Sequence, residues 1–230
     1  MSDSRARPAL VDVGGGTGNY SAALRELGMR PVVADVDPGM LAVAASKQLP
    51  VVRTDAAALP FADRSVDAVL LCSMLHHVPD WAQALAEACR VARPGGRVVL
   101  MAFTREHLEV HWIMEYFPET TAHFVDAHQT MDDLTRALPG ASATPVRYED
   151  LVDGSMAALC RHPELLLDPD IRRQTSYFDH AETDHPDELA AGVRALDRDL
   201  AAGRHPDDEV AEVRDRIGDA VVLTWTAPAS

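Results

Sequence analysis

Four glycines stand within five consecutive positions, in the stretch Gly14-Gly15-Gly16-Thr17-Gly18. An apolar run at 8–13 precedes them, and a helix-like stretch beginning near Tyr20 follows. Glycine permits backbone angles and close approaches that a side chain forbids. The first N–H groups of a helix that starts after such a turn point toward whatever lies in it. The sequence therefore predicts a strand, a bare turn and a helix, with the main chain of the turn lying against a polar ligand.

Strand and helix patterns alternate along the first half of the chain. Short apolar runs predict five strands, at 8–13, 31–36, 50–55, 66–73 and 97–103. The stretches between them carry helix signals, so we expect right-handed crossovers and a parallel sheet that is covered on both faces. Ligands of such sheets lie at the carboxyl ends of the strands, which is where the glycine run falls.

The helix patterns come with their own start and stop signals. The first predicted helix presents Tyr20, Leu24 and Leu27 on one face and ends at Gly28. Asp37 is expected to cap the second helix, which begins at Pro38. Asp80 and Gln83 form a candidate capping box for a third helix, which the Pro-Gly-Gly at 94–96 is expected to break.

The second half of the chain has a different pattern. Residues 105–138 predict one or two helices, 142–150 a sixth strand, 155–216 further helices, and 219–227 a last strand. Leu189, Val193, Leu196 and Leu200 fall on one stripe of a helix at 187–202. We interpret residues 1–230 as a single domain that contains a ligand-binding core at 8–103, helical insertions at 104–142 and 150–217, and a final strand within 218–230.

Composition excludes several classes of function. The net charge is −15, from 36 acidic and 21 basic residues, so a nucleic-acid partner is disfavoured. No apolar run approaches the length of a membrane span, and residues 1–8 lack the hydrophobic stretch of a signal peptide, so we expect a cytoplasmic protein. Cys72, Cys89 and Cys160 are scattered without a CxxC pair, which favours reduced thiols and argues against a zinc site.

Two kinds of ligand compete for the glycine turn. A dinucleotide fold requires the spacing GxGxxG, but its third glycine would stand at position 19, which is Asn19. The spacing that is present runs from Asp12 through glycines at 14, 16 and 18. Asp35, at the end of the second predicted strand, suits both hydroxyls of a ribose in either ligand. Asp55 ends the third predicted strand, where its carboxylate can accept an adenine amino group.

Four motifs together indicate one family. The stretches "DVGGGTG", "DAAALPF", "HHVPD" and "RPGG" occur in order between about residues 8 and 103. In these motifs and their spacing the chain resembles the class I S-adenosylmethionine-dependent methyltransferases, in particular a small-molecule group of the type 11 kind. The resemblance implies an α/β fold: a Rossmann-like, doubly wound sheet of seven strands in the order 3-2-1-4-5-7-6, with the last strand inserted antiparallel and helical insertions forming a substrate lid.

The resemblance also assigns roles around S-adenosylmethionine as the cofactor. The backbone of Gly14, Gly16 and Gly18 would cradle its methionine portion, and Asp12 would set that loop and face the amino group. The ribose would be held by Asp35, and the adenine by Asp55 together with the backbone of Ala56. Cys72 and Ser73, directly after the fourth strand, would line the floor near the sulfonium.

Histidines are the candidate catalytic residues. The end of the fourth strand faces the methyl group in this fold, and a neutral histidine is the usual proton acceptor near pH 7. His77 is therefore a candidate base or hydrogen-bonding partner of a substrate, with His76 as its neighbour; alternatively, one of the pair packs and supports the loop. His107, His111 and Glu115 are spaced for a metal site or for a polar helix face, but no HExxH or cysteine partner accompanies them, so we expect no metal.

The expected function is methyl transfer from S-adenosylmethionine to an oxygen, nitrogen or carbon atom of a small molecule, with bacterial specialised metabolism as one setting. The alternative is a cyclase-like or isomerase-like protein that binds the same cofactor structurally and does not methylate. A nicotinamide-dependent oxidoreductase is disfavoured by Asn19 and by the later motifs. Neither the acceptor nor the choice between monomer and homodimer follows from the sequence.

Overall fold

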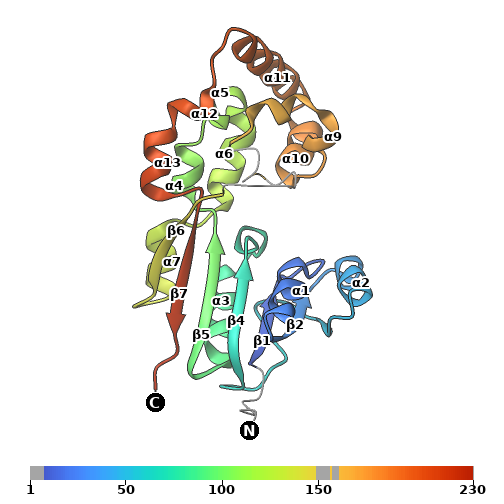
Figure 1. Cartoon of the computed structure of the whole chain (residues 1–230), viewed down its shortest axis with the longest axis vertical. Helices are drawn as coiled ribbons and strands as arrows, with labels where there is room; N and C mark the ends of the chain where they lie inside the picture. Colours follow the sequence, from blue (N-terminus) through green and yellow to red (C-terminus); the bar gives the residue numbers. More distant parts are fainter. Residues whose placement is uncertain (1–7, 149–155, 157–160, 230) are drawn as a thin grey trace. The chain divides into compact units, whose positions relative to one another are not determined.

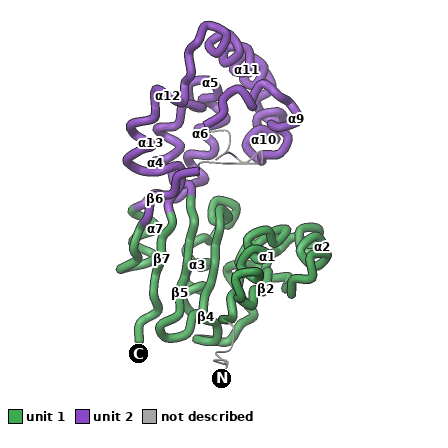
Figure 2. The backbone as a smooth tube through the Cα atoms, in the orientation of Figure 1, with its two compact units in different colours: residues 1–102, 132–143, 222–230 green, residues 103–131, 144–221 purple. Residues whose placement is uncertain are grey.

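The structure is a computed structural model that describes residues 8–148, 156 and 161–229. The chain divides into two compact units (Figure 2). Unit 1 comprises residues 1–102, 132–143 and 222–230, and unit 2 comprises residues 103–131 and 144–221. Cys160, the N-terminal segment 1–7 and part of the second predicted insertion lie outside the described residues.

The sheet has the strand order predicted from the sequence, β3-β2-β1-β4-β5-β7-β6 (Figure 1). Neighbouring strands among the first five pair in parallel. The start of β5 bonds to the chain just after β7, with Gly95 N to Ala227 O at 3.0 Å and Ala227 N to Gly96 O at 2.9 Å, so β7 runs antiparallel. The strands are β1 Ala9–Val13, β2 Arg30–Asp35, β3 Val51–Arg53, β4 Val66–Cys72, β5 Ala92–Ala102, β6 Ser142–Val146 and β7 Ala220–Thr226.

The predicted caps of the crossover helices are largely present. The helices of this part are α1 Asn19–Glu26, α2 Pro38–Ser46, the short 3-10 helix η1 Leu75–His77, and α3 Trp81–Val91. Asp37 accepts hydrogen bonds from the first free N–H groups of α2. Asp80 accepts one from Gln83 N at 3.1 Å, which is the N-cap half of the predicted capping box.

Two local predictions in this part were wrong. Tyr20 is 51% exposed and Leu27 is 81% exposed, and the buried residue of α1 is Ser21, so the expected apolar face does not pack into the core. The strand β5 begins at Ala92, before the Pro-Gly-Gly, and the register between β4 and β5 shifts there. Ala92 pairs with Val66 of β4, and this pairing accounts for the early start.

Unit 2 is built mainly from short helices. Residues 105–138, predicted as one or two helices, form four, because Pro118 starts a new helix and residues between the others leave the helical path. The longest helix of this unit matches the stretch predicted at 187–202. The helices are α4 Arg105–Glu109, α5 Ile113–Tyr116, α6 Pro118–Ala127, α7 Met131–Ala137 (mostly in unit 1), η2 Pro163–Leu167, α9 Pro169–Arg172, α10 Ser176–Asp184, α11 Pro186–Ala201, α12 Pro206–Glu209 and α13 Ala211–Ile217.

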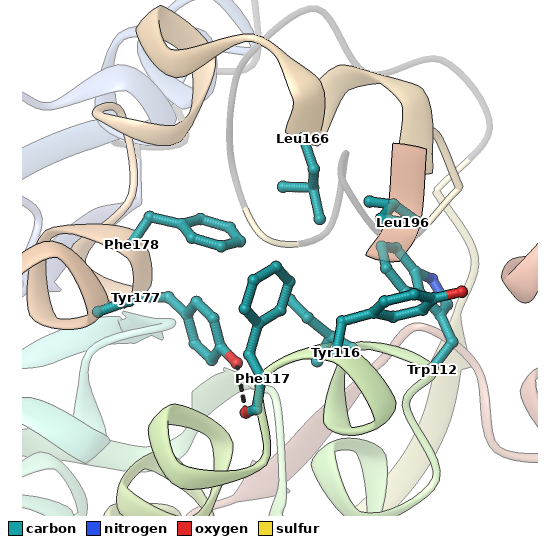
Figure 3. Close-up of a cluster of buried hydrophobic side chains, with 9 residues drawn as sticks. Trp112, Tyr116, Phe117, Leu166, Tyr177, Phe178 and Leu196 are labelled. Carbon is teal, nitrogen blue, oxygen red and sulfur yellow. Dashed lines mark hydrogen bonds between the residues drawn. The ribbon is translucent and has the colours of Figure 1, made fainter. Parts of the chain in front are cut away.

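Unit 2 has its own aromatic core (Figure 3). Phe117 lies in the middle of the cluster, with Tyr177 and Phe178 on one side of it, and the Tyr177 hydroxyl donates to the Phe117 carbonyl at 3.4 Å. The stripe predicted on α11 packs here, with Leu196 fully buried and Leu189, Val193 and Leu200 partly buried against it. None of the helices in the part of the chain that the structure describes is long and apolar enough to cross a membrane.

The spaced residues His107, His111 and Glu115 have separate local roles. His107 is buried and its Nδ1 accepts from Thr104 N at 3.1 Å, while the Nδ1 of buried His111 accepts from Ile113 N at 3.0 Å. Exposed Glu115 binds the guanidinium of Arg204 at 2.7 Å. Among the residues described, no three histidine, cysteine or acidic side chains are arranged to hold a metal ion.

The burial of His111 predicts a loss of stability in acid. Desolvation lowers the pKa of His111 from 6.5 to about 3. Between these values the unfolded chain binds a proton that the folded chain does not, so the free energy of unfolding falls as the pH falls, by about 1.4 kcal/mol per pH unit from this residue. His111→Asn keeps an acceptor for Ile113 N but does not titrate. Urea titrations from pH 7 to pH 5 should give a shallower pH dependence for the variant, and parallel curves would contradict this account.

Candidate functional site

A pocket of about 630 Å³ lies in unit 1, where β1, β2, β3 and β4 end. Its size is typical of sites for small ligands and cofactors, and its place is the one at which open parallel sheets bind them. Six predicted cofactor residues and one predicted catalytic residue line it: Gly14, Gly16, Asp35, Asp55, Ala56, Ser73 and His77. The remaining lining residues, which the sequence did not single out as ligand contacts, are Ala34, Val36, Asp37, Met40, Thr54, Met74, Val78 and Pro79.

The glycine turn forms one wall of this pocket. Gly14, Gly16 and Gly18 have φ values of 65°, 52° and 74°, as the sequence predicted. A Cβ on Gly18 would lie 2.5 Å from Cδ1 of Leu49, whereas a Cβ on Gly16 would meet nothing within 4 Å. Gly18 is therefore required by packing, while the bare face of Gly16 adjoins open space in the pocket.

Asp35 is held in place by the backbone around it. Its Oδ2 accepts from Gly16 N at 2.8 Å, which joins the end of β2 to the glycine turn, and its Oδ1 accepts from Asp37 N at 2.9 Å. A carboxylate oxygen has two acceptor sites, so each oxygen retains one for a ligand. The two remaining sites suit a pair of neighbouring hydroxyl groups.

Beside Asp35, the pocket is lined by a second carboxylate, Asp55, and by the apolar side chains of Val36 and Met40. Asp55 Oδ1 accepts from Ala57 N at 2.8 Å, so a turn of its own main chain fixes this exposed carboxylate. Val36 is 65% exposed and Met40 is 47% exposed, although both are apolar. A flat aromatic ring between these side chains and Asp55 would cover that apolar surface. Large apolar residues directly after a strand and in the first turn of α2 were the sequence signal that could have identified them.

Three predicted cofactor residues do not line the pocket. Gly18 packs against Leu49, and Cys72 is half-buried beside Met101, with 4.0 Å between the two sulfur atoms. Burial raises the pKa of the Cys72 thiol, which keeps it protonated. Asp12 is only 1% exposed, and its Oδ2 accepts from the Ser21 hydroxyl at 2.6 Å.

Asp12 nevertheless has one carboxylate oxygen that accepts no hydrogen bond from the described residues. Its buried Oδ1 has no hydrogen-bond partner among the atoms described, and desolvation raises the pKa of this carboxyl above its usual value. A buried acceptor without a partner is costly unless a donor or a positive charge approaches it. An ammonium group near the glycine turn would lower that cost.

His77 is the predicted catalytic residue that reaches the pocket. It ends the helix η1, and its ring lies 3.9 Å from that of His76, at an interplanar angle of 48°. His76 is half-buried and does not line the pocket. Although His77 is exposed as a residue, neighbouring atoms partly desolvate its imidazole and lower its pKa. The ring is therefore neutral at pH 7 and able to accept a proton.

These features together fit an adenosyl group whose tail carries an ammonium group. Asp35 offers acceptors for two hydroxyls, Asp55 for an amino group, and Asp12 a negative partner near the turn. The bare backbone at Gly16 allows a ligand to lie directly on the main chain.

Comparisons with known proteins agree on the type of enzyme. A family described as "Methyltransferase domain" matches residues 11–100. A demethylmenaquinone methyltransferase of Mycolicibacterium paratuberculosis is 32% identical over 172 residues, which cover 66% of this chain and 75% of that protein. The protein of the same name from Mycobacterium tuberculosis is 34% identical over 152 residues, but this chain spans only 58% of its length.

A solved structure extends the similarity over nearly the whole fold. A crystal structure of a protein from Anabaena variabilis, described as a methyltransferase from an antibiotic biosynthesis pathway, aligns with a TM-score of 0.77 and 25% identity. The alignment covers 96% of this chain and 91% of that one. The similarity therefore includes the helical segments after residue 103 and is not confined to the sheet.

Proposed function

The chain belongs to the class I S-adenosylmethionine-dependent methyltransferases, and on that premise we propose that it transfers a methyl group to an oxygen, nitrogen or carbon atom of a small-molecule acceptor. The observation that carries the proposal is the pocket at the strand ends, in which Asp35 is locked to the bare glycine turn by its bond to Gly16 N. That arrangement suits a ribose, and Asn19, which stands where a dinucleotide turn needs glycine, favours an adenosyl sulfonium over a dinucleotide.

The part of the protein in the reaction is to align the cofactor with the acceptor and to protect the reacting groups from water. Bound S-adenosylmethionine supplies an activated methyl group, so the difficult chemistry belongs to the cofactor. Asp35 and Asp55 would fix the ribose and the adenine, and Asp12 would face the amino group of the amino acid tail. A fixed cofactor brings the methyl group into line with an acceptor and removes most of the entropic cost of their meeting.

The acceptor is selected, in this proposal, by the residues outside the shared core. The family model matches residues 11–100 only, and segments 104–142 and 150–217, which we propose form the substrate lid, lie outside that match. The net charge of −15 favours a small molecule over a nucleic acid as the acceptor.

His77 gives this proposal a kinetic test. Because partial burial lowers the pKa of its imidazole, His77 would take a proton from the acceptor or hydrogen-bond it at neutral pH. His77→Ala should slow turnover by about 100-fold, the lower range for loss of a general base, and leave the affinity for S-adenosylhomocysteine nearly unchanged. His76→Ala is the matched control on the same short helix and should have a smaller effect. Equal turnover in the His77 variant and the wild type would remove this residue from the catalytic set.

Acceptor screening tests the reaction itself. The protein is incubated with S-adenosylmethionine carrying a labelled methyl group and a panel of phenols, amines and quinols. Demethylmenaquinone is included in the panel because relatives bear its name. Label on a small molecule supports the proposal. Tight binding of S-adenosylhomocysteine together with no labelled product, across acceptors of all three atom types, would instead support the alternative in which the cofactor serves a protein that does not methylate.

A further inference from the structure

Two side chains that lie outside the pocket, Glu87 and Arg90, bind the segment that continues from one of the pocket's walls. The pocket loop runs from Thr54 to Ala58 and continues into residues 59–63, which lie against the end of α3. From α3, Glu87 and Arg90 reach this second segment and bond to its main chain. We call residues 59–63 the anchored segment.

Four hydrogen bonds from Glu87 and Arg90 reach the anchored segment, and three of them are made to its backbone. Glu87 Oε2 accepts from Leu59 N at 2.8 Å, and Arg90 Nη2 donates to the Leu59 carbonyl at 3.0 Å, so both polar groups of Leu59 are used. Arg90 Nη1 donates to the Phe61 carbonyl at 2.9 Å and to Asp63 Oδ1 at 2.6 Å. Glu87 and Arg90 of α3 thus satisfy main-chain groups of the segment, as the main chain of a neighbouring strand would.

The two side chains also fix each other. Arg90 Nε lies 2.6 Å from Glu87 Oε1, and Arg90 Nη2 lies 2.8 Å from Oε2, which is a bidentate pair. The guanidinium lowers the pKa of the Glu87 carboxyl, which keeps it ionised as an acceptor, and Glu87 raises the pKa of Arg90 further above its ordinary value. A lysine offers a point charge and lacks the planar fork that serves several oxygens at once.

The anchored segment is continuous with the pocket through a tight turn. Ala58 N donates to the Asp55 carbonyl at 3.1 Å, and the Thr54 hydroxyl donates to the Ala58 carbonyl at 2.9 Å. Leu59, the next residue, is buried. A shift of Leu59 would therefore be transmitted through Ala58 to the carboxylate of Asp55, which lines the pocket.

We propose that Glu87 and Arg90 are positioning residues for the cofactor, which act through Leu59 to set where Asp55 and Ala56 meet the adenine. The inference rests on the proposed function, because it supposes that the pocket holds an adenosyl group. It goes beyond that function by assigning cofactor affinity to two residues that do not line the pocket.

The test measures binding of S-adenosylhomocysteine by calorimetry, in the full chain. Arg90→Met removes every donor and keeps the apolar stem; we expect the dissociation constant to rise at least tenfold. Arg90→Lys should recover part of that loss. Arg93→Met is the matched control, since it breaks the ion pair of exposed Arg93 with half-buried Asp67 in the same unit, without touching residues 54–63. The control should bind within twofold of the wild type.

A double-mutant cycle separates positioning from general support of the fold. If Arg90 acts through Asp55, Arg90→Met should weaken binding much less in an Asp55→Ala background than in the wild type. A role in stability alone would give equal losses in both backgrounds. Should Arg90→Met fail to fold, Glu87→Gln is measured in the same cycle. Hydrogen exchange at the Leu59 amide, which should rise in either variant, provides a readout independent of the ligand.

The outcomes distinguish this inference from the function on which it rests. No binding of S-adenosylhomocysteine by the wild-type protein would overturn both. Binding by the wild type together with an Arg90→Met affinity within twofold of it, or with additive losses in the cycle, would overturn only the positioning role.

Discussion

Replacing Asp35 by alanine is expected to weaken binding of S-adenosylhomocysteine at least tenfold. The carboxylate would accept two ribose hydroxyls, and hydrogen bonds to a charged group contribute roughly 1.5 kcal/mol each, so a loss of about 100-fold is the central expectation. The variant also loses the bond to Gly16 N, which ties the glycine turn to the end of β2. Calorimetric titration measures the change.

Two further variants complete the Asp35 experiment. Asp35→Asn keeps the shape and one acceptor, so it should fall between the wild type and alanine. Glu26→Ala removes an exposed carboxylate at the end of α1 and controls for the change in net charge. A dissociation constant within twofold of wild type in Asp35→Ala would show that the ribose does not lie at this carboxylate.

Gly16→Ala is expected mainly to weaken ligand binding, whereas Gly18→Ala is expected mainly to lower stability. Both positions have positive φ, which costs a residue with a Cβ about 1–2 kcal/mol. At Gly18 the new Cβ would also lie 2.5 Å from Cδ1 of buried Leu49, and such overpacking adds about 1–3 kcal/mol. Gly18→Ala should therefore lower the free energy of unfolding by about 2–5 kcal/mol.

Gly16→Ala should cost only the backbone contribution of about 1–2 kcal/mol, because its Cβ meets no neighbour within 4 Å. The same methyl group would stand on the pocket wall where the ligand lies, so affinity for S-adenosylhomocysteine should fall at least tenfold. Urea titrations and calorimetry on both variants give the comparison. The account of this turn would be contradicted if Gly16→Ala lost stability but kept its affinity for S-adenosylhomocysteine, while Gly18→Ala lost affinity but kept its stability.

The sheet could be predicted from the sequence because its signals are local. Each strand of the first half is a short apolar run, and the family resemblance supplied the order of all seven. Two polar residues of the pocket, Asp35 and Asp55, could be predicted for the same reason, because each stands at the end of a strand pattern. The early start of β5 was not, because it depends on the pairing of Ala92 with Val66 across an irregularity in the register of β4 and β5.

Other features depend on packing that a single sequence does not reveal. Tyr20 and Leu27 have helical spacing and are nevertheless exposed, since the side of α1 that is buried carries small Ser21. Val36 and Met40 are apolar and exposed, which only the pocket explains. Glu87 and Arg90 would ordinarily be assigned to a solvated helix face. Their bonds to residues about thirty positions away show otherwise.

Calorimetric titration of the wild-type protein with S-adenosylhomocysteine, beside a parallel titration with NADH, tests the central claim most directly. The account predicts saturable binding of one S-adenosylhomocysteine per chain and no detectable binding of NADH at the same concentrations, because the glycine turn has Asn19 where a dinucleotide turn needs glycine. No binding of S-adenosylhomocysteine, or tighter binding of NADH, would contradict it.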